Sequence, residues 1–241
     1  MGLGTRAGTI AAPMDVPAVV VIVAAHNEAD RIEQTLAAVG QAFPGARVLV
    51  ADDASTDDTA ARAAAAGAEV ITAPRNIGKG GANTLAARRV LSLALTPEPP
   101  VFVLCDGDLG DTAEQLPALV AAVRRGECDL AVAAFARRVG GGFGVAVGYA
   151  HSAIRRLTGL ELDAPISGQR AMRGEVLPVV VPFAPRFGME IGMTVDAARA
   201  GFTVGEIELE LAHRATGRTL RGFVHRARQL KDFALTEFSR R

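Results

Sequence analysis

Four short apolar runs, each ending in a cluster of polar residues, constrain the fold of this chain more than any other feature. In chain order the runs are AVVVIVAA (18–25), RVLVA (47–51), AEVIT (68–72) and VFVLC (101–105). Stretches with apolar residues three and four positions apart separate them, as in helices with one buried face. Short apolar strands that alternate with helices predict a parallel sheet with right-handed crossovers and helices on both faces.

Length and composition support one domain of this α/β class, with a Rossmann-like, mostly parallel sheet. The chain has 241 residues, of which 49% are hydrophobic and 22% charged, so a sizeable core is expected. Its 26 basic and 26 acidic residues cancel, which argues against nucleic acid as a partner. No apolar stretch approaches the roughly 20 residues that span a bilayer. Residues 1–16 resemble a flexible leader rather than a signal peptide, and we expect a cytoplasmic protein.

The polar residues that follow each run are the first candidates for a site. In open parallel sheets, ligands bind outside the carboxyl ends of the strands. The candidates in chain order are His26, Asn27 and Glu28; then Asp52 and Asp53; then Asn76, Gly78 and Lys79; then Asp106 and Asp108. Lysine occurs only at positions 79 and 231, which draws attention to Lys79.

Asp106 and Asp108 follow the fourth run at i and i+2, a spacing that lets two carboxylates share one cation. Hard cations such as Mg²⁺ and Mn²⁺ favour oxygen ligands and often bridge to substrate phosphates. The alternative is a helix cap, but Asp111 and Glu114 already form a capping-box pattern for the next helix.

The second and third clusters suit a nucleotide. Asp52 and Asp53 can accept hydrogen bonds from a base or from ribose hydroxyls. Ser55 or Thr56 is the expected N-cap of the next helix, with Gly67 at its end. Residues 78–81, Gly-Lys-Gly-Gly, precede a helix, a geometry that favours phosphate. They do not match a Walker A loop, and no run ends in G-x-G-x-x-G, which disfavours ATPase and hydride-transfer functions.

The second half of the chain is less regular. We expect a strand in DLAVAAFARR (129–138), a helix in YAHSAIRRLTGL (149–160), a compact segment ISGQRAMRG (166–174), a helix over 187–201 and a strand that runs into a basic loop. The predicted organisation is a domain over 17–218, divided into a nucleotide-binding half (17–128) and an acceptor half (129–218). A basic amphipathic helix over 219–241 follows it.

These motifs together resemble the family-2 glycosyltransferases of the GT-A fold. AAHNEADRI stands at the place of the family's P-x-Y-N-E-E segment, although His26 replaces its tyrosine; VADDASTDDT matches V-D-D-x-S-x-D-x-T, and CDGD matches the D-x-D metal motif. The resemblance implies nucleotide contacts from Ala24, His26, Glu28, Asp52, Asp53, Lys79 and Asp106. It also implies Mg²⁺ or Mn²⁺ held by Asp106, Asp108 and His213.

Two subgroups of the family share further segments with this chain. ISGQRAMRG resembles the S-G-F-R segment of polyprenyl-phosphate sugar synthases such as dolichyl-phosphate mannose synthase. NIGKGGAN followed by VFVLCDGDL resembles glucosyl-3-phosphoglycerate synthase. Both resemblances suit a phosphate-bearing acceptor. Contacts to it are expected from Ser167, Gly168, Gln169, Arg170, Arg214 and Arg218, and two further arginines, Arg173 and Arg186, could also hold its phosphate by bidentate hydrogen bonds.

The catalytic residues expected from the sequence are Asp108, Glu190 and Arg170. Glu190 is the best carboxylate for a general base, although a glutamate on a helix surface is the commoner interpretation. The sequence shows no clear base elsewhere, which favours an acceptor whose phosphate oxygen is already anionic.

The sequence therefore predicts a metal-dependent, inverting glycosyltransferase. It would use a nucleotide sugar, UDP-linked rather than GDP-linked, with polyprenyl phosphate favoured over a small phosphorylated acid as acceptor. Two other classes stay open, a nucleotidyltransferase and a non-catalytic sugar-nucleotide-binding protein. The C-terminal helix is expected to pack on the domain; the alternative is contact with the inner face of a membrane. A homodimer is compatible with the sequence.

Overall fold

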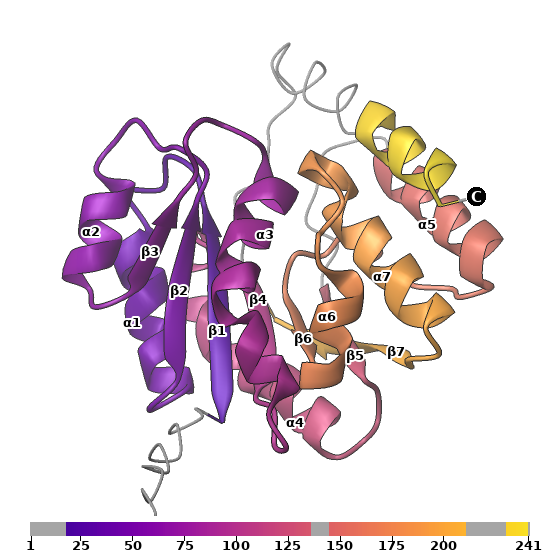
Figure 1. Ribbon diagram of the computed structural model, residues 1–241, viewed down its shortest axis with the longest axis horizontal. Coiled ribbons are helices and arrows are strands. Elements are labelled where there is room, and N and C mark those ends of the chain that lie inside the picture. Colours follow the sequence, from indigo (N-terminus) through magenta and orange to yellow (C-terminus); the bar gives the residue numbers. More distant parts are fainter. Residues whose placement is uncertain (1–17, 136–144, 211–229, 241) are drawn as a thin grey trace, which may run out of the picture.

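The computed structural model describes residues 18–135, 145–210 and 230–240 (Figure 1). In this part of the chain, seven strands form one sheet in the order β3-β2-β1-β4-β6-β5-β7. The strands are β1 (Val19–Ala25), β2 (Arg47–Asp52), β3 (Glu69–Thr72), β4 (Val101–Asp106), β5 (Leu130–Phe135), β6 (Arg170–Met172) and β7 (Val204–Leu209). All neighbours pair in parallel except β6, which is antiparallel to both β4 and β5.

Helices cover both faces of this sheet. The α-helices are α1 (Ile32–Ala42), α2 (Thr59–Ala65), α3 (Lys79–Val90), α4 (Pro117–Arg124), α5 (Val145–Thr158), α6 (Leu177–Val180) and α7 (Met189–Arg199). The short 3₁₀ segments are η1 (Leu91–Leu95), η2 (Gly110–Gln115), η3 (Gly174–Val176) and η4 (Arg186–Gly188). Residues 230–238 are also helical.

The buried strands explain this layering, because alternate side chains of a strand point to opposite faces. In β1, Val21 and Val23 join a core formed with α1, α2 and α4, whereas Val20 and Ile22 join a core formed with α3, α6 and α7. Both faces of β1 are therefore apolar, as a strand at the centre of a parallel sheet requires. The predicted Rossmann-like, mostly parallel fold is confirmed.

A third, smaller core joins α5, α7 and the 230–238 helix, which lie side by side in Figure 1. Phe233 is buried there and stacks on Tyr149 of α5. The Glu237 carboxylate accepts hydrogen bonds from the Tyr149 hydroxyl (2.7 Å) and from Arg156. The expected packing of the C-terminal helix on the domain is thus confirmed for residues 230–238. No helix among the described residues has the length and apolar character needed to cross a membrane.

Two predicted helix starts are wrong. The helix expected from Ser55 or Thr56 begins at Thr59, because the Ser55 hydroxyl accepts a hydrogen bond from the Asn27 amide instead (2.9 Å). The Asp57 carboxylate, one residue before the N-cap position, accepts hydrogen bonds from the Thr59 amide (3.0 Å) and the Thr59 hydroxyl. Gly67 follows this helix with a φ of 86°, as expected of a helix C-terminus.

The predicted capping box of Asp111 and Glu114 does not form. Residues 110–115 are a 3₁₀ segment without a side-chain cap, and the α-helix begins at Pro117. Proline suits that first position because its φ is preset and its missing N–H would have no partner there.

Candidate active site

The loops that follow β1, β2 and β3 are joined to one another through Asp53. One oxygen of its buried carboxylate accepts the Ile77 amide (2.7 Å) and the other accepts the Gly78 amide (2.9 Å). Asp53 therefore holds the loop that leads into α3. The amides of Ile77 and Gly78, at the helix start where a phosphate was predicted, already donate to the Asp53 carboxylate.

His26 and Asn27, after β1, complete this set of hydrogen bonds. The Nδ1 atom of His26 lies 2.9 Å from the Asp53 backbone oxygen, so Nδ1 is the donor. Asn27 has a φ of 57°, in the left-handed region, and its side-chain oxygen accepts the Thr56 amide at 2.8 Å. Asparagine tolerates this backbone conformation better than most residues.

Three further predicted nucleotide residues lie at the same edge. The Ala24 oxygen accepts the Gly107 amide (2.8 Å) and so fixes the start of the loop after β4. Glu28 is half-buried, and its amide donates to the Thr59 hydroxyl. Asp52 is 1% exposed; one carboxylate oxygen accepts the Ser55 amide (3.1 Å), and the other is buried without a hydrogen-bond partner in the described residues.

The centre of the site is an ion-paired cluster that we call the Lys79 centre, formed by Lys79, Asp106 and Glu190. The Lys79 Nζ atom lies 2.6 Å from Asp106 Oδ1 and 2.9 Å from Glu190 Oε1. The three side chains come from the first turn of α3, the end of β4 and the first turn of α7. Their exposed fractions are 24%, 32% and 8%, so the cluster is partly open to solvent.

The charge state of this centre follows from its geometry. Burial by itself would lower the pKa of Lys79, but the charges of Asp106 and Glu190 outweigh burial and raise that pKa above its usual value. Lys79 is therefore a fixed ammonium group. Glu190 is buried beside it, which contradicts the commoner interpretation of a helix-surface glutamate.

The segment before β6 supplies a second set of contacts to Asp106. The Gln169 amide group donates to Asp106 Oδ2 (2.8 Å), and the Ser167 hydroxyl donates to the Gln169 side-chain oxygen (3.2 Å). Gly168 lies so close that a Cβ there would fall 2.3 Å from Lys79 Nζ. A side chain at position 168 would displace the Lys79 ammonium group from its place beside Asp106.

Arg170 occupies a different place from the one predicted for it. Its side chain has no exposed surface and donates to the Ser167 oxygen (2.9 Å), the Pro165 oxygen (3.1 Å) and the Thr194 hydroxyl (2.9 Å). Burial lowers its pKa to about 10, which leaves it charged near neutral pH. The expected contact with an acceptor phosphate is not available in this structure, since every donor points into the protein. Arg170 instead ties the 165–167 segment to α7.

Asp108 lies two residues beyond Asp106 and is half-buried. Its backbone oxygen accepts a hydrogen bond from Arg31 (3.3 Å), and the Thr35 hydroxyl fixes the preceding turn through the Gly107 oxygen (2.8 Å). The described residues contain no group of three His, Cys, Asp or Glu side chains arranged around a metal position.

The donor chemistry still fits a divalent cation. Mg²⁺ is usually held by one or two carboxylates plus substrate phosphates and water rather than by a complete protein cage. Asp108 provides such a carboxylate at the edge of the sheet. Asp106 lies two residues before it, and in this structure its two oxygens contact Lys79 and Gln169. The third predicted ligand, His213, and the predicted acceptor residues Arg214 and Arg218 lie outside the described residues.

The structure thus brings Lys79, Asp106, Gln169 and Glu190 into one cluster, with Ser167 and Gly168 beside it. Sequence reasoning missed the turn of residues 184–186, which covers the first turn of α3. A Cβ on Gly80 would fall 1.9 Å from the Ala184 oxygen. The glycines at positions 78 and 80 were the available signal, because closely spaced glycines mark close backbone approach.

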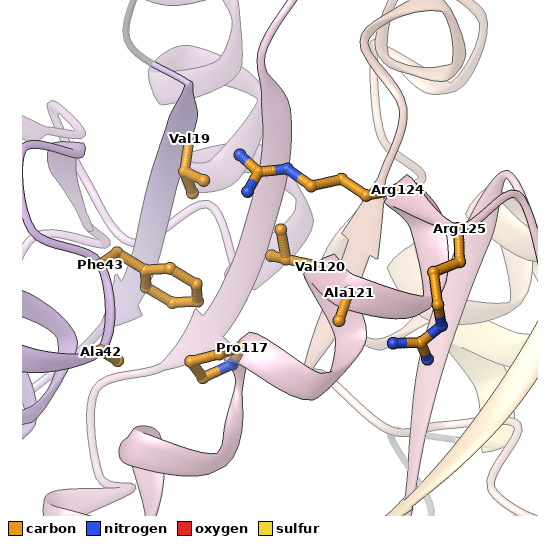
Figure 2. Close-up of a pocket in the computed structure, with 8 residues that line it drawn as sticks. All are labelled: Val19, Ala42, Phe43, Pro117, Val120, Ala121, Arg124 and Arg125. Atoms are coloured by element: carbon orange, nitrogen blue, oxygen red, sulfur yellow. The ribbon is translucent and has the colours of Figure 1, made fainter.

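A depression at the opposite edge of the sheet is unrelated to this cluster (Figure 2). It lies where β1 begins, between the end of α1 and α4. Its lining residues are Val19, Ala42, Phe43, Pro117, Val120, Ala121, Arg124 and Arg125. It contains no carboxylate or other catalytic group, so we assign it no role.

Comparisons with known proteins give the chain its relatives. Residues 20–180 match the family model described as glycosyl transferase family 2. Undecaprenyl-phosphate mannosyltransferase of Micrococcus luteus is 31% identical over 217 residues, which are 83% of this chain and 86% of that protein. Glucosyl-3-phosphoglycerate synthase of Mycolicibacterium paratuberculosis is 32% identical over 203 residues, which are 73% of this chain and 58% of that protein.

Solved structures agree with these sequence matches. The crystal structure of glucosyl-3-phosphoglycerate synthase from Mycobacterium tuberculosis in complex with Mn²⁺, UDP and glucosyl-3-phosphoglycerate is similar, with a TM-score of 0.69 and 29% sequence identity. The match covers 92% of this chain and 80% of that one.

Proposed function

The chain belongs to glycosyl transferase family 2 and is a glycosyltransferase, and we propose that it transfers a sugar from a UDP-sugar to a phosphate-bearing acceptor. Polyprenyl phosphate is the favoured acceptor. The observation that carries the proposal is the Lys79 centre, which lies at the carboxyl end of β4 beside Asp108. It offers a fixed cation and carboxylates where a sugar diphosphate would lie.

Asp108 and Asp106 would hold a Mg²⁺ or Mn²⁺ ion in this enzyme. Bound there, the ion would neutralise charge on the diphosphate of the donor. Two related structures support this ion chemistry, because they are complexes of glucosyl-3-phosphoglycerate synthase with Mn²⁺ and UDP and with Mg²⁺ and UDP.

The residues of the chain then have separate tasks. Lys79, held between two carboxylates, would face the negative charge that develops on the leaving diphosphate. Asp53 would keep the 76–78 loop in place for the nucleotide. In the reaction, an oxygen of the acceptor phosphate forms a bond to the anomeric carbon. The bond from that carbon to the donor phosphate oxygen breaks, and UDP leaves with the electron pair. One such displacement inverts the anomeric configuration.

The position of Glu190 favours a phosphate acceptor over a sugar hydroxyl. A general base must reach the proton that it removes, yet Glu190 Oε1 is engaged by Lys79 at 2.9 Å. An anionic phosphate oxygen needs no base. We therefore assign Glu190 to positioning Lys79, so Glu190→Gln should lower kcat about tenfold without introducing a new pH dependence. A loss near a thousandfold that follows one ionisation would instead identify Glu190 as the base.

Two observations support a lipid-linked acceptor. The match to undecaprenyl-phosphate mannosyltransferase covers most of that protein, whereas the match to glucosyl-3-phosphoglycerate synthase covers 58% of its sequence. In addition, Leu235 and Phe238 on the C-terminal helix are 56% and 77% exposed, on the same face as Lys231. A helix face with apolar residues and a cation suits an anionic membrane surface. We propose that this face contacts the membrane; a homodimer stays a prediction.

The test is a transfer assay with purified protein. Labelled UDP-glucose, UDP-galactose and GDP-mannose would each be incubated with Mn²⁺ and either polyprenyl phosphate or 3-phosphoglycerate. We expect transfer from a UDP-sugar to polyprenyl phosphate and at least a hundredfold loss in Asp108→Asn. Transfer only to 3-phosphoglycerate would overturn the favoured acceptor. Donor binding without transfer would favour the non-catalytic alternative, and release of pyrophosphate from a nucleoside triphosphate would favour the nucleotidyltransferase.

A further inference from the structure

Arg186 stands out because its backbone conformation is unfavourable for an arginine. Its φ is 53°, and among the described residues only Asn27 and Ala54 are other non-glycine residues with positive φ. Asn27 and Ala54 belong to the loops after β1 and β2, at the edge of the sheet where the Lys79 centre lies. Strain of this kind persists where the surrounding structure imposes it, and it gathers at functional sites.

The surroundings of Arg186 impose that conformation directly. The residue packs on Gly78, where a Cβ would fall 2.7 Å from Arg186 Cγ and 2.9 Å from Arg186 Cα. Gly78 precedes Lys79, and Arg186 precedes Glu190 by four residues. The base of the arginine side chain is therefore held against the loop that presents the Lys79 ammonium group.

The guanidinium of Arg186 has no charged partner among the described residues. Its side chain is exposed, and it has no hydrogen bond or ion pair with any described residue. Other arginines on the acceptor side differ: Arg156 pairs with Glu237, Arg173 with Asp129, and Arg240 with Asp196. Arg186 differs from an ordinary exposed arginine because its backbone has a positive φ and packs on Gly78, next to Lys79.

We propose that Arg186 is a substrate-binding residue whose guanidinium contacts a phosphate group over the first turn of α3. The planar guanidinium can donate two parallel hydrogen bonds to phosphate, which a lysine cannot. The phosphate belongs either to the donor diphosphate or to the acceptor. The proposal rests on the proposed function, because that function names these two substrates. It adds a second cation, from a different element, to the one that Lys79 supplies.

Arg186→Gly gives a sharp test, because two effects should move in opposite directions. Glycine adopts positive φ without strain, so thermal stability should stay the same or rise. Binding of phosphate should weaken about tenfold to a hundredfold, as expected for loss of a charge-assisted contact. Arg186→Lys should recover part of this affinity. Arg88→Gln is the matched control, since Arg88 is also exposed and without an ion pair, but lies in the last turn of α3.

Binding of UDP with Mn²⁺ and of inorganic pyrophosphate would be measured by calorimetry, and the KM of the acceptor in the transfer assay. If Arg186→Gly binds UDP and pyrophosphate more weakly, Arg186 contacts the donor diphosphate. If only the KM of the acceptor rises, Arg186 contacts the acceptor phosphate. The proposal is overturned if every one of these values stays within twofold of Arg88→Gln. If the wild type transfers no sugar, the proposed function fails, while pyrophosphate binding still decides the role of Arg186.

Discussion

The two sides of the site are held in place in different ways. On the side proposed to bind the nucleotide, which we call the nucleotide side, backbone amides donate to side-chain oxygens of neighbouring loops, as the amides of residues 77 and 78 do to Asp53. On the acceptor side, a buried guanidinium, that of Arg170, holds the 165–167 segment against α7. Lys79 joins the two sides, because it pairs with Asp106 at the end of β4 and with Glu190 on α7.

This difference follows from the topology of the sheet. Parallel strands end at one edge, so the loops after β1, β2 and β3 are neighbours and can share hydrogen bonds. On the acceptor side the antiparallel strand β6 lies between β4 and β5. Because β6 runs the other way, the segment that precedes it lies at the edge where the parallel strands end. A buried side chain, that of Arg170, holds this segment in place. The nucleotide side should accordingly tolerate the loss of one contact better than the acceptor side.

Removing the link between the two sides should have the largest effect. Lys79→Met leaves Asp106 and Glu190 close together without a cation, and we expect transfer activity to fall about 10²- to 10³-fold. Arg88→Gln is the matched control, since Arg88 is exposed in the last turn of the same helix and forms no ion pair with a described residue. Steady-state kinetics would measure both. Activities of the two variants within threefold of each other would show that Lys79 does not join the two sides.

Replacing Arg170 should destabilise the acceptor side. Arg170→Met keeps most of the volume but leaves the Ser167 and Pro165 oxygens buried without donors, so we expect a loss of about 3 kcal/mol in the free energy of unfolding. Urea denaturation measures this loss. The KM for the acceptor should rise while UDP binding changes little. An unchanged stability would mean that the apolar replacement offsets the lost hydrogen bonds and that this side has another anchor.

A change on the nucleotide side should affect UDP binding rather than the KM of the acceptor. Asp53→Ala removes the acceptor of two amides, and we expect a loss of about 2 kcal/mol in unfolding free energy. UDP binding should weaken while the acceptor KM stays the same. Asp53→Asn, which keeps one acceptor oxygen, should lose about half as much. If Asp53→Ala raised only the acceptor KM, the division into two sides would be wrong.

The smallest effect is expected from Asp57, whose carboxylate accepts hydrogen bonds from Thr59 at the start of α2. The hydrogen bond from the Thr59 side chain is the main cause that lowers the pKa of Asp57 below its usual value of 3.8. A lowered folded-state pKa means that Asp57 stabilises the fold above that usual value and loses this contribution as pH falls through the folded-state pKa. Asp57→Ala should therefore cost about 1 kcal/mol at pH 7. The difference from wild type should vanish in strongly acidic solution, and a difference independent of pH would contradict the assignment.

The sequence predicted which residues lie together better on the proposed nucleotide side than on the proposed acceptor side, for a physical reason. Each strand end there is marked by an apolar run followed by polar residues, so the positions of Asp53, Lys79 and Asp106 follow from a local pattern. The antiparallel pairing of β6 is a long-range contact and leaves no such pattern in ISGQRAMRG. Sequence alone therefore placed Arg170 against the acceptor rather than in the core.

The same limit explains Glu190 and Arg186. The sequence pattern around Glu190 predicts a surface position on a helix, and only the ion pair between the first turns of α7 and α3 shows that it is a partner of Lys79. The left-handed conformation of Arg186 is equally invisible in sequence, because glycine or asparagine is the usual signal for it. Both residues depend on where the second half of the chain meets α3.

We propose that the edge of the sheet beside Asp108 and the Lys79 centre binds a complex of a divalent metal ion and a nucleotide. The most direct measurement is calorimetric titration of UDP into the wild type and into Asp108→Asn, with and without Mn²⁺. We predict that Mn²⁺ tightens UDP binding to the wild type at least tenfold and that Asp108→Asn loses this gain. UDP affinity that is equal with and without Mn²⁺ would show that this edge does not bind a metal–nucleotide complex. An Asp108→Asn variant that keeps the Mn²⁺-dependent increase in affinity would show that Asp108 does not hold the metal.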